Sequence, residues 1–410
     1  MRIAVITLVC AALASTSATQ AATRARDLGV PFDGTPGKLD AITDVPGVEV
    51  GQTTVIRGNG PLVRGRGPVR TGVTIIFPTG KTGRNAVAAG RTVINGTGEF
   101  TGMALVDEVG QLFGPIGLTG TGNISIVRDA MIDWAGRPGY LPDDEFIIHT
   151  LPAVGETLDI PLNDAFGHPL SREDVFAALD GAKPGPVAEG NVGGGTGMIA
   201  YGFKGGIGTA SRVVADSDRS YIVGVLLQAN HGARRDLRIA GVPVGEEISD
   251  LKPEMRDRFT HRTGGGGDGA ERPSPKNSLL IIIATDVPLQ AHQLQRVARR
   301  AALGVGRTGS TAGNYSGEFA LAFSTTNTSS WSGATEKKLV VNDNDQGLMD
   351  ALFRATVEAI EEALVNQLVA SETMVGADGA RVYGLPHDRL VSLLKKYNRY
   401  HGSGAQPRGE

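Results

Sequence analysis

The sequence predicts an α/β fold in which buried strands alternate with amphipathic helices. Two kinds of segment carry this prediction: continuous apolar runs of strand length, such as 278–286, and helix-period patterns, such as 347–368. The 58 glycines, against an aromatic content of only 5%, indicate many tight turns and close backbone contacts, which are typical of a loop-rich α/β enzyme. A chain of 410 residues is long enough to bury one large core or two.

The first 21 residues have the pattern of a secretory signal peptide. Met1 and Arg2 form a short basic region, residues 3–14 are largely apolar, and small residues lead to a cleavage site expected near Ala21. This run is too short to span a bilayer, and no later segment reaches the length of a transmembrane helix. The only cysteine, Cys10, lies inside it, so we expect a mature chain without thiols, in the periplasm or secreted.

The chain up to residue 261 is expected to form strands and short helices joined by glycine-rich loops. The pattern predicts strands at 42–51, 70–78, 146–148 and 221–232, and helices at 125–134 and 171–179, the second with a capping motif at its start. Glycine-dense loops, which would bring backbone amides close to a ligand or another strand, are expected at 93–102 and 114–122. Two further glycine-rich stretches, 189–198 and 204–211, resemble phosphate loops only superficially.

A flexible linker is predicted at 262–277, because this stretch is rich in glycine and polar residues and has no apolar face. It runs directly into a buried strand, and Ser278 is the last polar residue before the apolar run. Such a serine is either an ordinary strand start or a new N-terminus released by self-cleavage. The remaining regular elements are expected at 289–303 (helix), 319–323 (strand) and 347–368 (helix).

Several common kinds of functional site have no support in the sequence. The net charge of −3 argues against a nucleic-acid surface, and no glycine-rich stretch fits a nucleotide-binding motif in its required context. The seven histidines are scattered, without the spacing of a zinc site, so no metal and no cofactor are predicted. A G-x-S-x-G motif is absent, while a Ser/His/Asp triad built from scattered residues stays open, with His231 as its best histidine.

An N-terminal serine at position 278 would combine a nucleophile and its base in one residue. The free α-amine has a pKa of roughly 7.7–8.0, far closer to neutrality than that of lysine. This amine exists only after the Asn277–Ser278 bond is broken. The same hydroxyl can break the bond by attacking the Asn277 carbonyl, which gives an ester that water hydrolyses. The loose segment before the bond and the rigid strand after it favour this step.

The residues around this junction resemble the cleavage site of the DmpA/BapA-type enzymes, the self-processing L-aminopeptidase/D-esterases and β-peptidyl aminopeptidases of peptidase family S58. The similar segments follow the family order over essentially the whole mature chain: 26–29, 190–211, 228–230, 277–289 and 314–318. The resemblance implies an αββα sandwich of two stacked mixed sheets flanked by helices. It also implies processing into an α-chain (22–277) and a β-chain (278–410), which stay associated as a tetramer of such pairs.

The resemblance further implies roles for individual residues. Ser278 matches the nucleophile, and Asn230 matches the side-chain amide of the oxyanion hole, where a neutral donor stabilises negative charge without titrating. Ser316 and Glu318 match the pair that hydrogen-bonds and polarises the surroundings of the nucleophile. Glu156 matches the carboxylate that receives the ammonium group of the substrate. Taken singly, each residue has an ordinary explanation, such as a turn cap or a surface acid.

These assignments predict a serine aminopeptidase that acts on small peptides, amides or esters with a free N-terminal amine, and on neither nucleic acid nor membrane. The acyl residue, a β-amino acid or an α-amino acid, stays open. The family pattern has an aromatic residue at the position of His231, so His231 receives no role. Two alternatives remain: an ornithine-acetyltransferase-like acyl transferase, which uses threonine at the cleavage point, and a non-catalytic periplasmic binding protein, which needs no cleavage.

Overall fold

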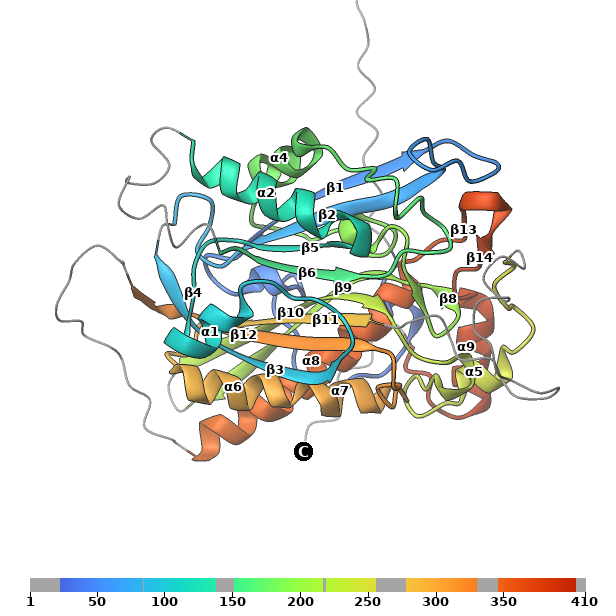
Figure 1. Ribbon diagram of the computed structural model, residues 1–410. Helices are drawn as coiled ribbons and strands as arrows, with labels where there is room; N and C mark the ends of the chain where they lie inside the picture. The colour runs from blue at the N-terminus through green and yellow to red at the C-terminus, as the bar shows by residue number, and fades with distance from the viewer. Residues whose placement is uncertain are drawn as a thin grey trace, which may run out of the picture.

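Two stacked β-sheets with helices on both outer faces form the protein, as a computed structural model shows (Figure 1). The structure describes residues 23–83, 85–137, 151–216, 219–255, 278–329 and 346–402. The four layers are the expected αββα sandwich. The predicted signal peptide, the predicted strand at 146–148 and the predicted linker at 262–277 lie outside the described residues.

The smaller sheet has four strands in the order β1-β2-β5-β6. Its first three strands pair antiparallel and the last joins in parallel; they are β1 (Glu49–Arg57), β2 (Val69–Phe77), β5 (Ile116–Gly120) and β6 (Ala153–Thr157). The outer face is covered by α2 (Ile124–Ala135) and α4 (Arg172–Gly181), which bury Trp134 and Leu179 against it (Figure 1). Helix α4 begins at Ser171 with the predicted capping box.

The larger sheet has six strands in the order β4-β3-β12-β11-β10-β9. Only the central pair β11/β12 is parallel among these neighbours; the strands are β4 (Gln111–Leu112), β3 (Ala86–Gly96), β12 (Gly317–Ser329), β11 (Ser278–Thr285), β10 (Arg219–Asn230) and β9 (Gly206–Asp216). Its outer face is covered by α6 (Ala291–Arg299), α7 (Ala301–Arg307) and α8 (Gln346–Val369) (Figure 1).

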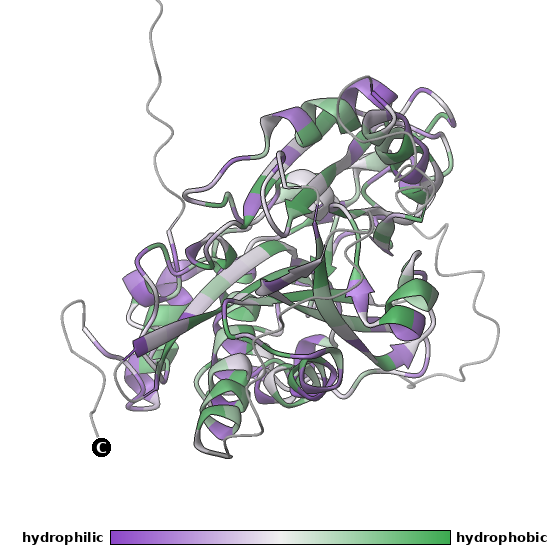
Figure 2. Ribbon diagram, turned by 90° about the vertical axis from the view of Figure 1, so that its left-hand side faces the viewer, coloured by the Kyte–Doolittle hydropathy of each residue, from purple (hydrophilic) through white to green (hydrophobic). Residues whose placement is uncertain are grey.

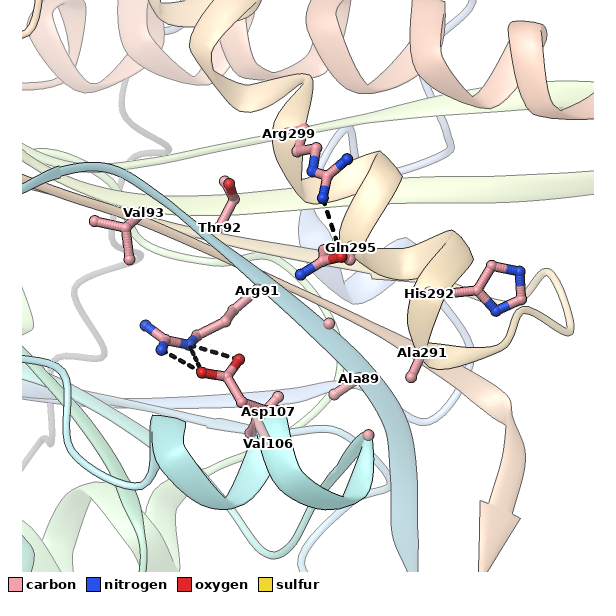
Figure 3. A pocket seen from close by; sticks show the side chains of 12 residues that line it. Ala89, Arg91, Thr92, Val93, Val106, Asp107, Ala291, His292, Gln295 and Arg299 are labelled. Atoms are coloured by element: carbon pink, nitrogen blue, oxygen red, sulfur yellow. Dashed lines mark hydrogen bonds and ion pairs between the residues drawn. The ribbon is translucent and has the colours of Figure 1, made fainter.

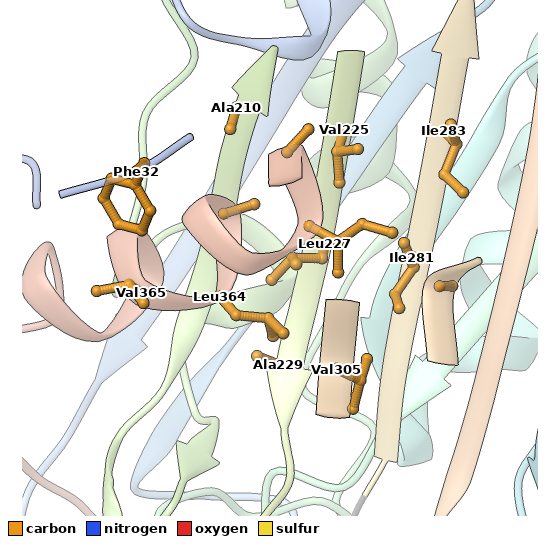
Figure 4. Packing of buried hydrophobic residues seen from close by; sticks show 14 of the residues in the cluster. Phe32, Ala210, Val225, Leu227, Ala229, Ile281, Ile283, Val305, Leu364 and Val365 are labelled. Carbon is orange, nitrogen blue, oxygen red and sulfur yellow. The ribbon is translucent and has the colours of Figure 1, made fainter. Parts of the chain in front are cut away.

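Strand β11 is buried on both faces, which explains its continuous apolar run. Because side chains alternate along a strand, Leu279 and Ile281 pack toward the helices, together with Leu364 of α8 (Figure 4). Leu280 and Ile282 point the other way, into the layer between the two sheets. In the view turned by 90°, green apolar residues run through the strands and the helices that cover them (Figure 2).

Smaller elements complete the chain. The helices are α1 (Met103–Val109), α5 (Val244–Glu247) and α9 (His387–Lys396), and two hairpins pair β7 (Ile199–Ala200) with β8 (Phe203–Lys204) and β13 (Met374–Val375) with β14 (Arg381–Val382). Short 3-10 turns lie at Arg26–Leu28, Ile42–Asp44, Thr121–Asn123, Gly193–Gly195, Arg234–Asp236 and Ala377–Gly379. Within the described ranges, no helix is both long and apolar enough to cross a membrane.

Four predicted elements differ from the structure. The expected strand at 42–51 begins only at Glu49, because Asp44 accepts hydrogen bonds from the backbone of Leu39 and Ala41 and closes a 3-10 turn instead. The expected loops at 93–102 and 114–122 contain the end of β3 and all of β5. The expected helix at 289–303 is two helices that meet at Arg300.

Candidate active site

Ser278 is the first residue of β11 and lies between two neighbouring strands. Its backbone pairs with Asn230 at the end of β10 on one side and with Gly317 at the start of β12 on the other. Ser278 and Asn230 are buried. By strand alternation, Ser278 shares a face with Leu280, which packs between the sheets. Asn230, its direct ladder partner, shares that face, so both side chains emerge at one end of the layer between the sheets.

The Asn230 side chain has a fixed orientation. Its Oδ1 accepts a hydrogen bond from the backbone N–H of Ile199 at 2.8 Å. This contact identifies the oxygen end of the amide, so the Nδ2 donors are directed away from Ile199. A neutral amide whose donor end is held in one direction suits the stabilisation of developing negative charge.

Ser316 and Glu318 form a buried pair beside Ser278. They flank Gly317, and the Glu318 carboxyl shares a hydrogen bond with the Ser316 side chain. Burial raises the pKa of Glu318 to about 7, and the bond to Ser316 opposes this rise. Among the described residues, Glu318 Oε2 has no hydrogen-bond partner. The pair can therefore take up or share a proton near neutral pH.

Glu156 lies on β6, in the opposite sheet, and its carboxylate is held by two donors. Oε1 accepts from the backbone N–H of Glu99 at 3.1 Å, and the Thr121 hydroxyl donates to Oε2. The bare backbone of Gly98 separates this carboxylate from the larger sheet. A Cβ on Gly98 would lie 3.1 Å from Gly317 Cα and 3.3 Å from Glu156 Oε1. Glu156 is thus within a few ångströms of the strand that pairs with Ser278.

The five predicted site residues that the structure describes therefore lie near one end of the central strands of the larger sheet. Ser278 and Asn230 share the face between the sheets, whereas Glu318 pairs with Leu279 and by strand alternation lies on the opposite face. Asn277 lies outside the described residues. Three further residues that support the site had not been predicted. Asn95 donates to Ser316 Oγ at 3.2 Å, Thr121 donates to Glu156, and Gln228 bridges the sheets by donating to Thr119 O (2.8 Å) and Thr157 Oγ1 (2.7 Å). The position of Gln228, two residues before Asn230 on one strand face, is the one signal that could have found it.

His231 has no part in a catalytic triad within the described residues. The ring is fully buried, its centroid lies 4.9 Å from that of Tyr201, and neither ring nitrogen has a hydrogen-bond partner in the described structure. Burial lowers the pKa of His231 to about 3, so the ring is neutral at physiological pH. Nor does the described part of the chain hold a cluster of three or more His, Cys, Asp or Glu residues that would bind a metal ion.

A hollow of about 510 Å³ opens elsewhere on the molecule, between β3, α1 and α6 (Figure 3). Arg91 and Asp107 form an ion pair on one side of it, and His292, Gln295 and Arg299 line the other. None of the five predicted site residues contributes to its lining. This hollow is therefore separate from the candidate active site.

Comparisons with known proteins agree with this geometry. The sequence matches the model of peptidase family S58 over residues 40–382. It is 62% identical to the beta-peptidyl aminopeptidase BapA of Sphingosinicella xenopeptidilytica over 390 residues, which cover 95% of each chain. The matched residues 40–382 include every strand that carries a predicted site residue.

Two solved structures share the fold. The L-aminopeptidase D-Ala-esterase/amidase of Ochrobactrum anthropi, described as a prototype for the serine aminopeptidases and a variant of the Ntn hydrolase fold, superposes with a TM-score of 0.79 at 40% identity, over 92% of this chain and 99% of that one. A beta-aminopeptidase of a Burkholderia species gives 0.78 at 41% identity, over 94% and 100%. These matches set aside the acyl transferase and the binding protein. The chain belongs to peptidase family S58 and is a serine aminopeptidase of the N-terminal-nucleophile type.

Proposed function

We propose that the chain cuts itself between Asn277 and Ser278, and that the released Ser278 is the nucleophile of an aminopeptidase for substrates with a free N-terminal amine. The observation that carries the proposal is the position of Ser278, at the first residue of a central strand and directly opposite Asn230. The Ser278 hydroxyl attacks the Asn277 carbonyl, the Ser278 nitrogen leaves as an amine, and water hydrolyses the resulting ester.

In the processed enzyme, the Ser278 α-amine takes the hydroxyl proton while Oγ bonds to the substrate carbonyl. Asn230 Nδ2 stabilises the oxyanion of the tetrahedral intermediate. The intermediate collapses when the leaving amine takes the proton from the α-ammonium, which leaves an acyl ester on Ser278. Water then releases the acid. The buried pair Ser316 and Glu318 accepts hydrogen bonds from the α-ammonium and keeps it beside the hydroxyl.

Glu156 gives the enzyme its exopeptidase character, because its buried carboxylate receives the substrate ammonium. The Glu99 N–H and the Thr121 hydroxyl hold the Glu156 carboxylate in place. The names of the relatives support a β-amino acid as the released residue, since both the Sphingosinicella and the Burkholderia proteins are called β-aminopeptidases. We assign β-peptides and related short amides as the substrate class.

Maturation has further steps in this proposal. Residues 1–21 direct export and are removed, the α-chain (22–277) and β-chain (278–410) stay associated, and the pairs assemble into a tetramer in the periplasm or outside the cell. The basic start, apolar run and small residues of the first 21 positions support the export step.

The experiment combines mass spectrometry with a substrate panel. Purified protein should contain a chain that begins at Ser278, and it should hydrolyse p-nitroanilides of β-amino acids faster than those of α-amino acids. A protein that stays uncut and still hydrolyses the panel would refute Ser278 as an N-terminal nucleophile. A processed protein that prefers α-amino acids would refute only the substrate class.

A further inference from the structure

Lys204 is a fully buried lysine that the proposed mechanism does not use. It lies on β8, where its Nζ donates to three backbone carbonyls: Gly205 O at 2.6 Å, Met198 O at 2.9 Å and Gly195 O at 3.3 Å. Three acceptors match the three donors of an ammonium group. No carboxylate of the described residues forms an ion pair with it, and burial alone lowers the pKa of Lys204. The carbonyl dipoles oppose that effect and favour the charged form.

One peptide group joins Lys204 to the candidate oxyanion hole. The peptide between Met198 and Ile199 accepts from Lys204 Nζ through its carbonyl, at 2.9 Å, and donates to Asn230 Oδ1 through its N–H, at 2.8 Å. Both contacts belong to a single planar, conjugated unit. A continuous chain of hydrogen bonds therefore runs from the buried Lys204 Nζ, through the peptide, to the amide of Asn230.

We propose that Lys204 is a positioning residue that orients and polarises Asn230 through the Met198–Ile199 peptide. This inference rests on the proposed role of Asn230. A hydrogen bond donated to the carbonyl draws electron density from the peptide, so the Ile199 N–H becomes a stronger donor to Asn230 Oδ1. That contact in turn strengthens the Nδ2 donors at the other end of the amide, because hydrogen bonds in a chain reinforce each other by roughly 10–30% per bond.

The local sequence explains why a buried lysine is needed at this place. The segment before Met198 is Gly193–Gly194–Gly195–Thr196–Gly197, in which only Thr196 carries a side chain beyond hydrogen. Positions 194 and 195 leave no room for a Cβ beside Gln228, Leu118 and Ile207. The Thr54 and Thr74 hydroxyls accept hydrogen bonds from the backbone N–H groups of Gly193 and Gly194, and Lys204 Nζ binds the carbonyls of Gly195 and Met198 at the other end of the segment.

The test is a double-mutant cycle between Lys204 and Asn230. Lys204→Met keeps the length and apolar stem but removes the charge and the donors. The substrate is a p-nitroanilide with a free β-amine, and kcat is expressed per processed Ser278 end. This kcat should fall about 10-fold or more, with KM unchanged. The fall should not exceed the 10²–10³-fold loss expected when a single oxyanion donor is removed. In an Asn230→Ala background, Lys204→Met should cause no further loss.

Each outcome of the cycle decides a different question. Equal losses from Lys204→Met in both backgrounds would overturn the role of Lys204, because the effect would then bypass Asn230. An Asn230→Ala enzyme with unchanged kcat would instead refute the proposed function of Asn230 itself. Counting Ser278 ends by mass spectrometry removes any effect of incomplete processing from the comparison.

A backbone substitution keeps the proposal falsifiable if Lys204→Met does not fold. Replacement of Ile199 by its α-hydroxy acid exchanges the N–H for an oxygen, which deletes the donor to Asn230 and leaves Lys204 in place. The kcat loss should equal that of Lys204→Met, and a normal kcat would overturn the proposal.

Arg234→Met is the matched control. Arg234 also donates to several partly buried carbonyls, those of Tyr201, Gly202, Ile248 and Leu251, but none of these bonds reaches Asn230. This variant should lower Tm and leave kcat unchanged. A kcat loss equal to that of Lys204→Met would show general loosening of the hairpin region and overturn the assignment.

Discussion

Replacing Glu156 with glutamine should remove most of the aminopeptidase activity and leave the fold intact. The substitution keeps the shape of the side chain, and one amide oxygen can still accept from Glu99 N–H. It deletes the negative charge at a buried position, so the bound substrate ammonium is left unpaired. Loss of one partner from a buried, hydrogen-bonded charge pair costs about 2–5 kcal/mol, which corresponds to roughly a 30-fold to several-thousand-fold loss in kcat/KM.

The assay compares a β-homo-amino acid p-nitroanilide that has a free amine with its N-acetylated twin. The unmodified enzyme should cleave only the free-amine substrate well, and Glu156→Gln should lose this preference while it still cuts at Asn277–Ser278. Glu99→Gln is the matched control, because the Glu99 side chain is exposed and only its backbone contacts Glu156. It should change kcat/KM by a factor of about five or less, as exposed charges contribute about 0–1 kcal/mol. Equal rates for both substrates in the unmodified enzyme would refute the role of Glu156.

Four further outcomes are expected. Ser278→Ala should give one uncut chain on denaturing gels in place of bands of about 27 and 14 kDa, estimated from fragment length, and normal processing would exclude Ser278 as the nucleophile. Within that uncut variant, Glu318→Gln should raise Tm at pH 8 but not at pH 4. Burial raises the folded pKa of Glu318 to about 7, above its ordinary value of 4.5, so ionisation destabilises the fold progressively between these values and fully above them; equal shifts at both pH values would contradict this. In the processed enzyme, kcat/KM should rise with pH through the pKa of the Ser278 α-amine, roughly 7.7–8.0 before any shift by the site, and a flat profile would exclude that amine as the base. Intact mass should show a mature α-chain that begins near Ala22, and a retained, lipid-modified Cys10 would contradict export by simple cleavage.

The strands and helices that could be predicted from the sequence are those whose burial pattern is uniform. β11 is apolar on both faces because a sheet covers one and helices cover the other, and α8 has a periodic apolar stripe that packs on β9 and β10. β5 was expected to be a loop because its glycines suggest a turn. In the structure, a Cβ on Gly117 would lie 3.0 Å from Met131 Sδ, so glycine at this position admits α2 rather than bending the chain.

The residues of the candidate site also fall into two groups, those that could be predicted from the sequence and those that could not. Ser278, Asn230, Ser316, Glu318 and Glu156 were predicted through a resemblance that covers local motifs, and the fold brings them together. Asn95, Gln228 and Lys204 were not predicted, because their roles depend on hydrogen bonds to residues distant in the chain or to backbone carbonyls. Lys204 in particular sits in a Lys-Gly-Gly stretch that resembles a phosphate loop. Its carbonyl partners carry no side-chain signature, so only the folded geometry identifies what it binds.

If the Asn277–Ser278 bond is cut as proposed, the order of strands in the larger sheet tethers the two pieces during assembly and holds them together afterwards. The central strands β12 and β11 come from the segment after this bond, whereas β4 and β3 on one side and β10 and β9 on the other come from the segment before it. While the bond is intact, strands β11 and β12 insert between their neighbours within a single chain. The tether gives these strands a high effective concentration near the rest of the sheet. Once the sheet is complete, separation of the two pieces requires the ladders on both sides of the central pair to break and Leu280 and Ile282 to meet water. In the proposed maturation, folding therefore precedes the cut, and an enzyme unfolded after processing has lost the tether that guided its first folding.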